Sequence, residues 1–67
     1  MSEQKIRSYM RRYSNDYRDS TTNELNATWM TEGVTWDLGL CGIEDEIPER
    51  VYEIAFEVCE AVQNYEW

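Results

Sequence analysis

The last third of the 67-residue chain repeats apolar residues at intervals of three and four positions, which is the spacing of one face of an α-helix. These positions are Val51, Ile54, Ala55, Val58, Cys59, Ala61, Val62 and Tyr65. Pro48 suits the first helical position, because its ring fixes φ at a helical value and the N–H that it lacks would have no partner there. The proline also biases Ile47 away from helical backbone, so we expect a long helix that begins at Pro48.

The opposite side of this predicted helix is acidic. We call Glu49, Glu53, Glu57 and Glu60 the acidic stripe. Like charges four residues apart destabilise a helix by roughly 0.2–0.5 kcal/mol per pair, and a stripe chosen only for solubility would usually intersperse lysines. The stripe therefore predicts a site for a basic protein surface, with a purely solubilising surface as the alternative. The predicted partner-binding residues are Glu44, Asp45, Glu46, Glu49, Glu53, Phe56, Glu57, Glu60 and Trp67.

The first twenty residues differ from the rest in charge, because they hold five of the six basic residues and three acids in a chain of net charge −8. Ser2 suits a helix N-cap, and an apolar stripe follows at helical spacing. Its members are Ile6, Tyr9, Met10, Tyr13 and Tyr17. We expect this helix to end between Ser14 and Asp19. Arg7, Arg11 and Arg18 share one flank, which we expect to attract the acidic part of the same molecule; a site for phosphate or an acidic partner is the alternative.

The middle of the chain alternates apolar and polar residues on both sides of Glu32-Gly33. A two-residue turn there would place Trp29 opposite Trp36 on one side of a β-hairpin. We therefore predict an α+β fold, helix–β-hairpin–helix (αββα), with a two-stranded antiparallel hairpin packed against the helices. The alternative is an all-α, three-helix chain, because Thr21 and Glu24 fit a capping box and Gly33 fits a helix C-terminus, giving a helix over residues 22–32. The hairpin is preferred, since that segment has few apolar residues and three threonines.

Several classes of function find no support in the composition. The chain, a single domain over residues 1–67, has no histidine, no nucleophile–base set and no glycine-rich phosphate loop, so we expect neither an enzyme nor a cofactor. Cys41 and Cys59 are 18 residues apart, which does not match zinc spacing; we expect reduced, buried thiols, with a disulfide as the alternative. The negative charge disfavours direct contact with nucleic acid or a membrane. With no signal peptide or transmembrane run, we expect a cytoplasmic protein.

Glu44-Asp45-Glu46 and the acidic stripe, on so short, acidic and histidine-free a chain, resemble the small phage-encoded inhibitors of bacterial immunity. These include anti-CRISPR and antirestriction proteins, several of which are DNA mimics. The resemblance, in size and charge pattern, implies an inhibitor that occludes the basic nucleic-acid-binding surface of a host defence complex, for instance a CRISPR effector, in the bacterial cytosol. The alternative function is a small homo-oligomeric structural or regulatory subunit without DNA mimicry, whose exposed aromatic residues mediate homodimerisation. Monomer and homodimer both stay open.

Overall fold

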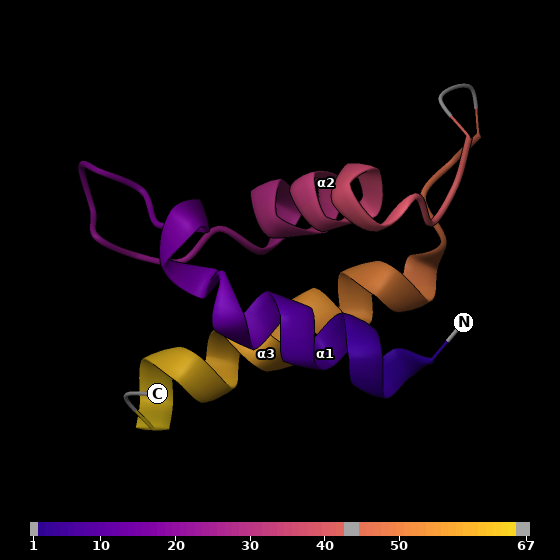
Figure 1. Ribbon diagram of the computed structural model, residues 1–67. Coiled ribbons are helices and arrows are strands. Elements are labelled where there is room, and N and C mark those ends of the chain that lie inside the picture. The colour runs from indigo at the N-terminus through magenta and orange to yellow at the C-terminus, as the bar shows by residue number, and fades with distance from the viewer. Residues whose placement is uncertain (1, 43–44, 66–67) are drawn as a thin grey trace.

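The computed structural model describes residues 2–42 and 45–65, except the side chain of Tyr65, and these residues form a helical fold (Figure 1). The elements are α1 (Glu3–Arg12), the 3₁₀-helix η1 (Ser14–Tyr17), α2 (Ala27–Leu38) and α3 (Glu49–Tyr65). In the view of Figure 1, α1 crosses in front of α3, and α2 lies above both. A loop leads from η1 to α2, and Arg18 and Leu25 form an isolated antiparallel bridge at its base.

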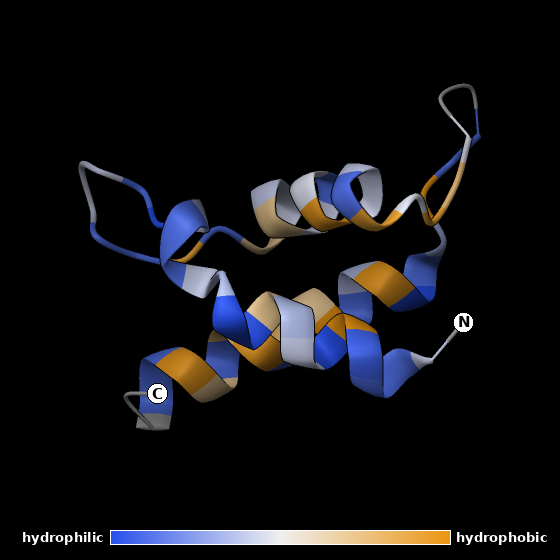
Figure 2. Ribbon diagram, in the orientation of Figure 1, coloured by the Kyte–Doolittle hydropathy of each residue, from blue (hydrophilic) through white to orange (hydrophobic). Residues whose placement is uncertain are grey.

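One apolar core lies where the three α-helices meet. Figure 2 shows apolar residues on the side of α2 that faces the other helices. The buried hydrophobic residues are Ile6, Met10, Tyr17, Leu25, Met30, Val34, Val51, Ile54, Ala55, Val58, Cys59 and Val62. Most residues of the apolar stripes predicted for the first and last helices lie in the core, although Tyr13 is exposed, Tyr17 belongs to η1 and the side chain of Tyr65 lies outside the described residues. The predicted end of the first helix between Ser14 and Asp19 is wrong, because α1 ends at Arg12, and α3 begins at Glu49, one residue after Pro48. Ser2 caps α1 as expected, because its hydroxyl accepts the backbone N–H of Lys5 at 3.4 Å.

The predicted β-hairpin is wrong, because most of the segment assigned to it forms α2 and the described ranges contain no strand. The all-α alternative describes the fold, although its helix runs over Ala27–Leu38 instead of residues 22–32. Asn26 begins this helix, since its side-chain oxygen accepts the Trp29 N–H at 2.9 Å. Gly39 ends it in a left-handed conformation with φ of 63°. The N–H groups of Gly39 and Leu40 return to the carbonyls of Trp36 and Thr35, which is a Schellman motif.

Two threonines on the buried side of α2 explain why a helix tolerates this sequence. The hydroxyls of Thr31 and Thr35 donate hydrogen bonds of 2.7 and 2.6 Å to the carbonyls four residues earlier. Their polar groups are thus satisfied inside the helix, and their methyl groups can pack in the core. The capping box expected at Thr21 and Glu24 does not form, because α2 begins later, at Ala27. Asp19 instead accepts the N–H groups of Thr21 and Thr22 and forms a turn of the loop.

Candidate interaction surfaces

The acidic stripe lies on the exposed side of α3, where all four of its glutamates are exposed. Phe56 lies on the same helix and exposes 67% of its surface, more than any other large hydrophobic residue in the described part of the chain. Asp45 and Glu46 are exposed ahead of the helix. The remaining two predicted site residues, Glu44 and Trp67, lie outside the described residues.

Arginines from two helices compensate the middle of the acidic stripe. The guanidinium of Arg50 binds both carboxylate oxygens of Glu3, with N–O distances of 2.8 and 3.0 Å. It also lies 3.7 Å from the carboxylate of Glu53 and 3.4 Å from that of Glu57. Arg7 of α1 approaches Glu57 to 3.5 Å. Hydrogen bonding to Arg50 is also the main cause that lowers the pKa of Glu3. Part of the stripe's charge is therefore used to join α3 to α1.

The three arginines of the predicted basic strip, Arg7, Arg11 and Arg18, do not form one site. Arg7 pairs with α3, as the sequence led us to expect. Arg18 donates to the Asn15 side chain at 3.1 Å and to the Asn23 carbonyl at 2.7 Å, and so holds the loop after η1 closed. Arg11 is exposed on α1. These positions give no indication of a shared phosphate site.

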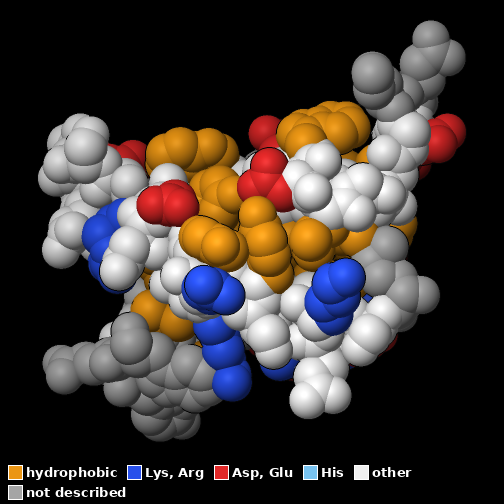
Figure 3. Space-filling view, in the orientation of Figure 1, with side chains coloured by type: hydrophobic (Ala, Val, Ile, Leu, Met, Phe, Trp, Pro, Cys, Tyr) orange, Lys and Arg blue, Asp and Glu red, His pale blue; other side chains and the backbone are white. Residues whose placement is uncertain are grey.

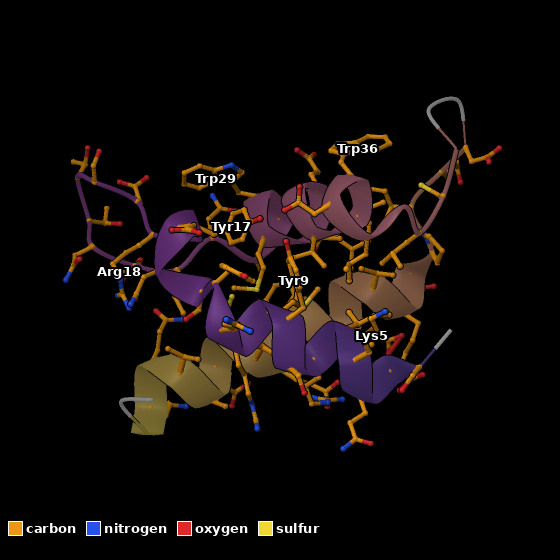
Figure 4. The ribbon with its side chains drawn as sticks, viewed as in Figure 1. Lys5, Tyr9, Tyr17, Arg18, Trp29 and Trp36 are labelled. Carbon is orange, nitrogen blue, oxygen red and sulfur yellow. The ribbon has the colours of Figure 1, made fainter. Side chains whose placement is uncertain are left out.

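A second surface, missed at the sequence level, carries exposed aromatic side chains. Trp29 and Trp36 project from the outer side of α2, with 48% and 50% of their surfaces exposed (Figure 4). Below Trp29, the ring of Tyr17 packs edge to face against the Trp29 indole, and the two ring centroids are 5.6 Å apart (Figure 4). On α1, the rings of Tyr9 and Tyr13 are 4.6 Å apart. We call these five residues the aromatic face.

Polar contacts fix two of the tyrosines in place. The Tyr9 hydroxyl donates a 3.0 Å hydrogen bond to the carboxylate of Asp37, and so links α1 to α2. Burial and the neighbouring Asp37 raise the pKa of Tyr9. The guanidinium of Arg12 lies 5.6 Å from the centre of the Tyr13 ring, within the range of a cation–π contact. Four of the five aromatic-face residues, namely Tyr9, Tyr13, Tyr17 and Trp29, are therefore restrained by a neighbouring side chain.

Gly33 brings the Tyr17 ring close to the backbone of α2. A β-carbon at this position would lie 2.6 Å from the Tyr17 hydroxyl oxygen and 2.6 Å from a ring carbon. The sequence suggested a turn or a helix end at this glycine, but it lies inside α2. Its missing side chain leaves the space in which the tyrosine packs beneath Trp29.

Charges of both signs lie on and around the aromatic face. Figure 3 shows lysine and arginine along α1, and acidic side chains on the side of η1 and α2 between groups of hydrophobic side chains. Lys5 and Arg12 are exposed on α1 and form a basic border, whereas Glu32 and Asp37 are exposed on α2. Asp37 accepts a hydrogen bond from the Tyr9 hydroxyl and so lies within the face. The face thus combines apolar area with charges of both signs.

The third feature is an open groove of about 670 Å³ between the loop after η1 and the second half of α3. Its lining includes Asp19, Leu25, Phe56, Cys59, Glu60 and Gln63. None of the five aromatic-face residues lines it. The groove and the aromatic face are therefore separate surfaces.

The described residues lack two further features. They contain no group of three or more potential ligands among His, Cys, Asp and Glu that could hold a metal ion. None of their helices combines the length and the apolar character needed to cross a membrane. Both cysteines are free: Cys59 is buried, as expected, whereas Cys41 is only partly buried.

No family model matches the chain, and no curated protein and no solved structure matches it either. The surfaces are therefore interpreted from their own chemistry. Sequence reasoning found the exposed acidic stripe, but it placed both tryptophans in a hairpin. The seven-residue interval from Trp29 to Trp36, two turns of helix, was the signal that could have revealed an aromatic surface.

Proposed function

We propose that this chain is a small, non-catalytic structural or regulatory subunit, and that two copies form a homodimer by packing their aromatic faces together. The supporting observation is the exposure of Trp29 and Trp36 on one side of α2. Tryptophan and tyrosine are the residues that most often dominate the binding energy of protein interfaces. We place the dimer in a cytosol, where Cys41 and Cys59 would stay reduced.

The area that such a dimer requires is a modest share of the molecule's surface. A stable interface buries about 800 Å² on each partner. That area is roughly a sixth of the 4758 Å² exposed by the described chain. The two half-exposed tryptophans contribute roughly 200 Å² of it at the centre. The tyrosines of α1 and η1 extend the apolar area towards the basic border.

The charge pattern supports a pairing of identical copies. In a two-fold dimer the same patch meets itself, and when the axis runs between α1 and α2 and parallel to them, α1 of one copy faces α2 of the other. Lys5 and Arg12 of one copy then approach Glu32 and Asp37 of the other. An axis in this direction therefore brings opposite charges together twice. A surface with one sign of charge would repel its own copy.

The inhibitor hypothesis stays a prediction of the sequence, and the ion pairs of the acidic stripe give it less support than the dimer. Charge mimicry needs carboxylates that are available to a basic partner. Arg50 and Arg7 already engage Glu53 and Glu57. One double variant separates the two hypotheses. Glu53→Lys with Glu57→Lys should abolish binding of a basic target if the inhibitor hypothesis holds, whereas in the dimer proposal it leaves self-association unchanged.

Light scattering after size-exclusion chromatography tests the dimer over a range of protein concentrations. We expect a dimer mass for the unchanged protein and a monomer mass for the variant with both Trp29→Ser and Trp36→Ser. Truncating a hot-spot aromatic residue costs about 2 kcal/mol or more of binding free energy, so the dissociation constant of the dimer should rise by more than tenfold. Both side chains are half-exposed, so the fold should survive, which circular dichroism would verify.

Phe56→Ser is the matched control, because Phe56 is an exposed aromatic residue outside the aromatic face. We expect it to leave the dimer intact. Glu32→Lys alone should weaken association. Adding Lys5→Glu should restore part of it, because the two substitutions together exchange the charges at positions 5 and 32. A protein that is monomeric at all concentrations, or equal loss of dimer in Phe56→Ser, would contradict the proposal.

A further inference from the structure

The groove between the loop after η1 and α3 combines an apolar wall with open access. Phe56 forms the exposed part of this wall, and Leu25 and Cys59 contribute buried side chains beneath it. The groove holds about 670 Å³ and is open to solvent. Pockets for small molecules are mostly closed around their ligand, whereas an open and partly polar groove suits an extended segment of chain.

The charged groups at this groove are all carboxylates, from Asp19, Glu24 and Glu60. No lysine or arginine of the described chain lines it. Hydrogen bonds from the backbone N–H groups of Thr22 and Thr21 lower the pKa of Asp19, so its carboxyl stays ionised at neutral pH. An occupant with positive charge is therefore attracted, and one with negative charge is repelled.

We propose that this groove docks a cationic peptide segment of a partner protein. An apolar side chain of the segment packs against Phe56, and flanking lysines or arginines face Glu24 and Glu60. The apolar contact is needed, because exposed ion pairs alone contribute little to affinity. The side-chain amides of Gln63 and Asn64 line the same groove and can hydrogen-bond to a peptide backbone. This docking site lies apart from the aromatic face and does not require it.

The probe is a fluorescein-labelled hexapeptide, Lys-Lys-Leu-Phe-Lys-Lys, titrated with the full chain and followed by fluorescence anisotropy. We expect saturable binding that Phe56→Ser weakens by about tenfold, the usual effect of removing an aromatic anchor. Glu60→Lys should weaken it severalfold. Glu49→Lys is the matched control, because it makes the same charge change on α3 away from the groove; there the change should stay within about twofold.

Four outcomes would overturn the proposal. The first is no binding of the peptide, and the second is equal weakening by Glu49→Lys and Glu60→Lys, which would indicate attraction to net charge alone. The third is equal binding of Lys-Lys-Ser-Ser-Lys-Lys, which lacks the apolar anchor. The fourth is loss of binding in the Trp29→Ser, Trp36→Ser variant, which would place the peptide on the aromatic face. Because that variant is titrated too, failure of the groove and failure of the dimer are distinguished.

Discussion

At the scale of single residues, Gly33 matters because the Tyr17 ring occupies the space that a side chain at position 33 would need. Glycine inside a helix is unfavourable by about 1 kcal/mol relative to alanine, so an isolated α2 would gain from the substitution. In the folded chain, the added β-carbon would lie 2.6 Å from the Tyr17 ring, and Tyr17 is itself buried. Overpacking of this kind costs about 1–3 kcal/mol. The clash should therefore outweigh the gain in helix propensity.

We predict that Gly33→Ala lowers the free energy of unfolding by roughly 1 kcal/mol, the difference between the packing cost and the helix gain. Urea denaturation followed by circular dichroism, at one fixed protein concentration, would measure it. The same substitution in a Tyr17→Leu background should instead be neutral or stabilising, because the shorter leucine leaves room for the methyl group. A similar loss in both backgrounds would show that the tyrosine contact is not the cause.

At the scale of elements, α1 and α3 were predictable and α2 was not. The two predicted helices separate apolar from polar residues cleanly around the helix. In α2 the separation is blurred, because two threonines face the core and two tryptophans face outward. Along the sequence this arrangement produces an alternation that resembles a strand. The hydrogen bonds of Thr31 and Thr35 to their own helix, which allow these hydroxyls to be buried, depend on a backbone that no local pattern reveals.

The caps of α2 compensate for its weak helix formers, so Asn26 should matter to the whole fold. We predict that Asn26→Ala lowers the free energy of unfolding by about 1 kcal/mol, because the first turn loses the acceptor for the Trp29 N–H. Asn26→Asp keeps an oxygen in the same place and serves as the control, with a change of a few tenths of a kcal/mol at most. Equal losses in the two variants would mean that the side-chain cap does not stabilise α2.

At the scale of the whole molecule, ionisable groups limit the pH range of the fold from both sides. Hydrogen bonds lower the pKa of Glu3 from 4.5 and of Asp19 from 3.8, so their contribution to stability is lost as the pH falls through the lowered values. Burial raises the pKa of Cys59 from 9.0 and of Tyr17 from 10.0. Their contribution is present below those values and is lost as the pH rises through the raised ones.

We therefore predict a plateau of melting temperature between about pH 4.5 and pH 9.0, with a fall on either side. Thermal unfolding followed by circular dichroism over a pH series would measure it. Tyr17→Phe, which removes one buried hydroxyl, should make the decline above pH 10 less steep and leave the acidic side unchanged. An alkaline decline of the same steepness in this variant would exclude Tyr17 as a contributor.

The candidate surfaces were predictable only as far as one helix could define them. The exposure of the acidic stripe and of Phe56 follows from the position of each residue around α3, and the sequence contains that information. The aromatic face needs α1, η1 and α2 at once, because Tyr9 reaches Asp37 and Tyr17 reaches Trp29 across elements. The groove likewise requires the loop to fold back against α3. Because the segment of α2 was predicted as a hairpin, neither surface could be predicted from the sequence.

The Arg50 guanidinium binds Glu3 at the start of α1 and also approaches Glu53 and Glu57. Those two glutamates therefore present different chemistry in the folded protein and in the unfolded chain. An excised α3 peptide keeps Arg50 beside Glu53 and Glu57, but it lacks Glu3, which shares that arginine in the folded protein, and Arg7, which approaches Glu57. The charge around the two glutamates therefore differs between the peptide and the protein. A peptide of the last helix is thus an inadequate substitute for the protein when partners are sought.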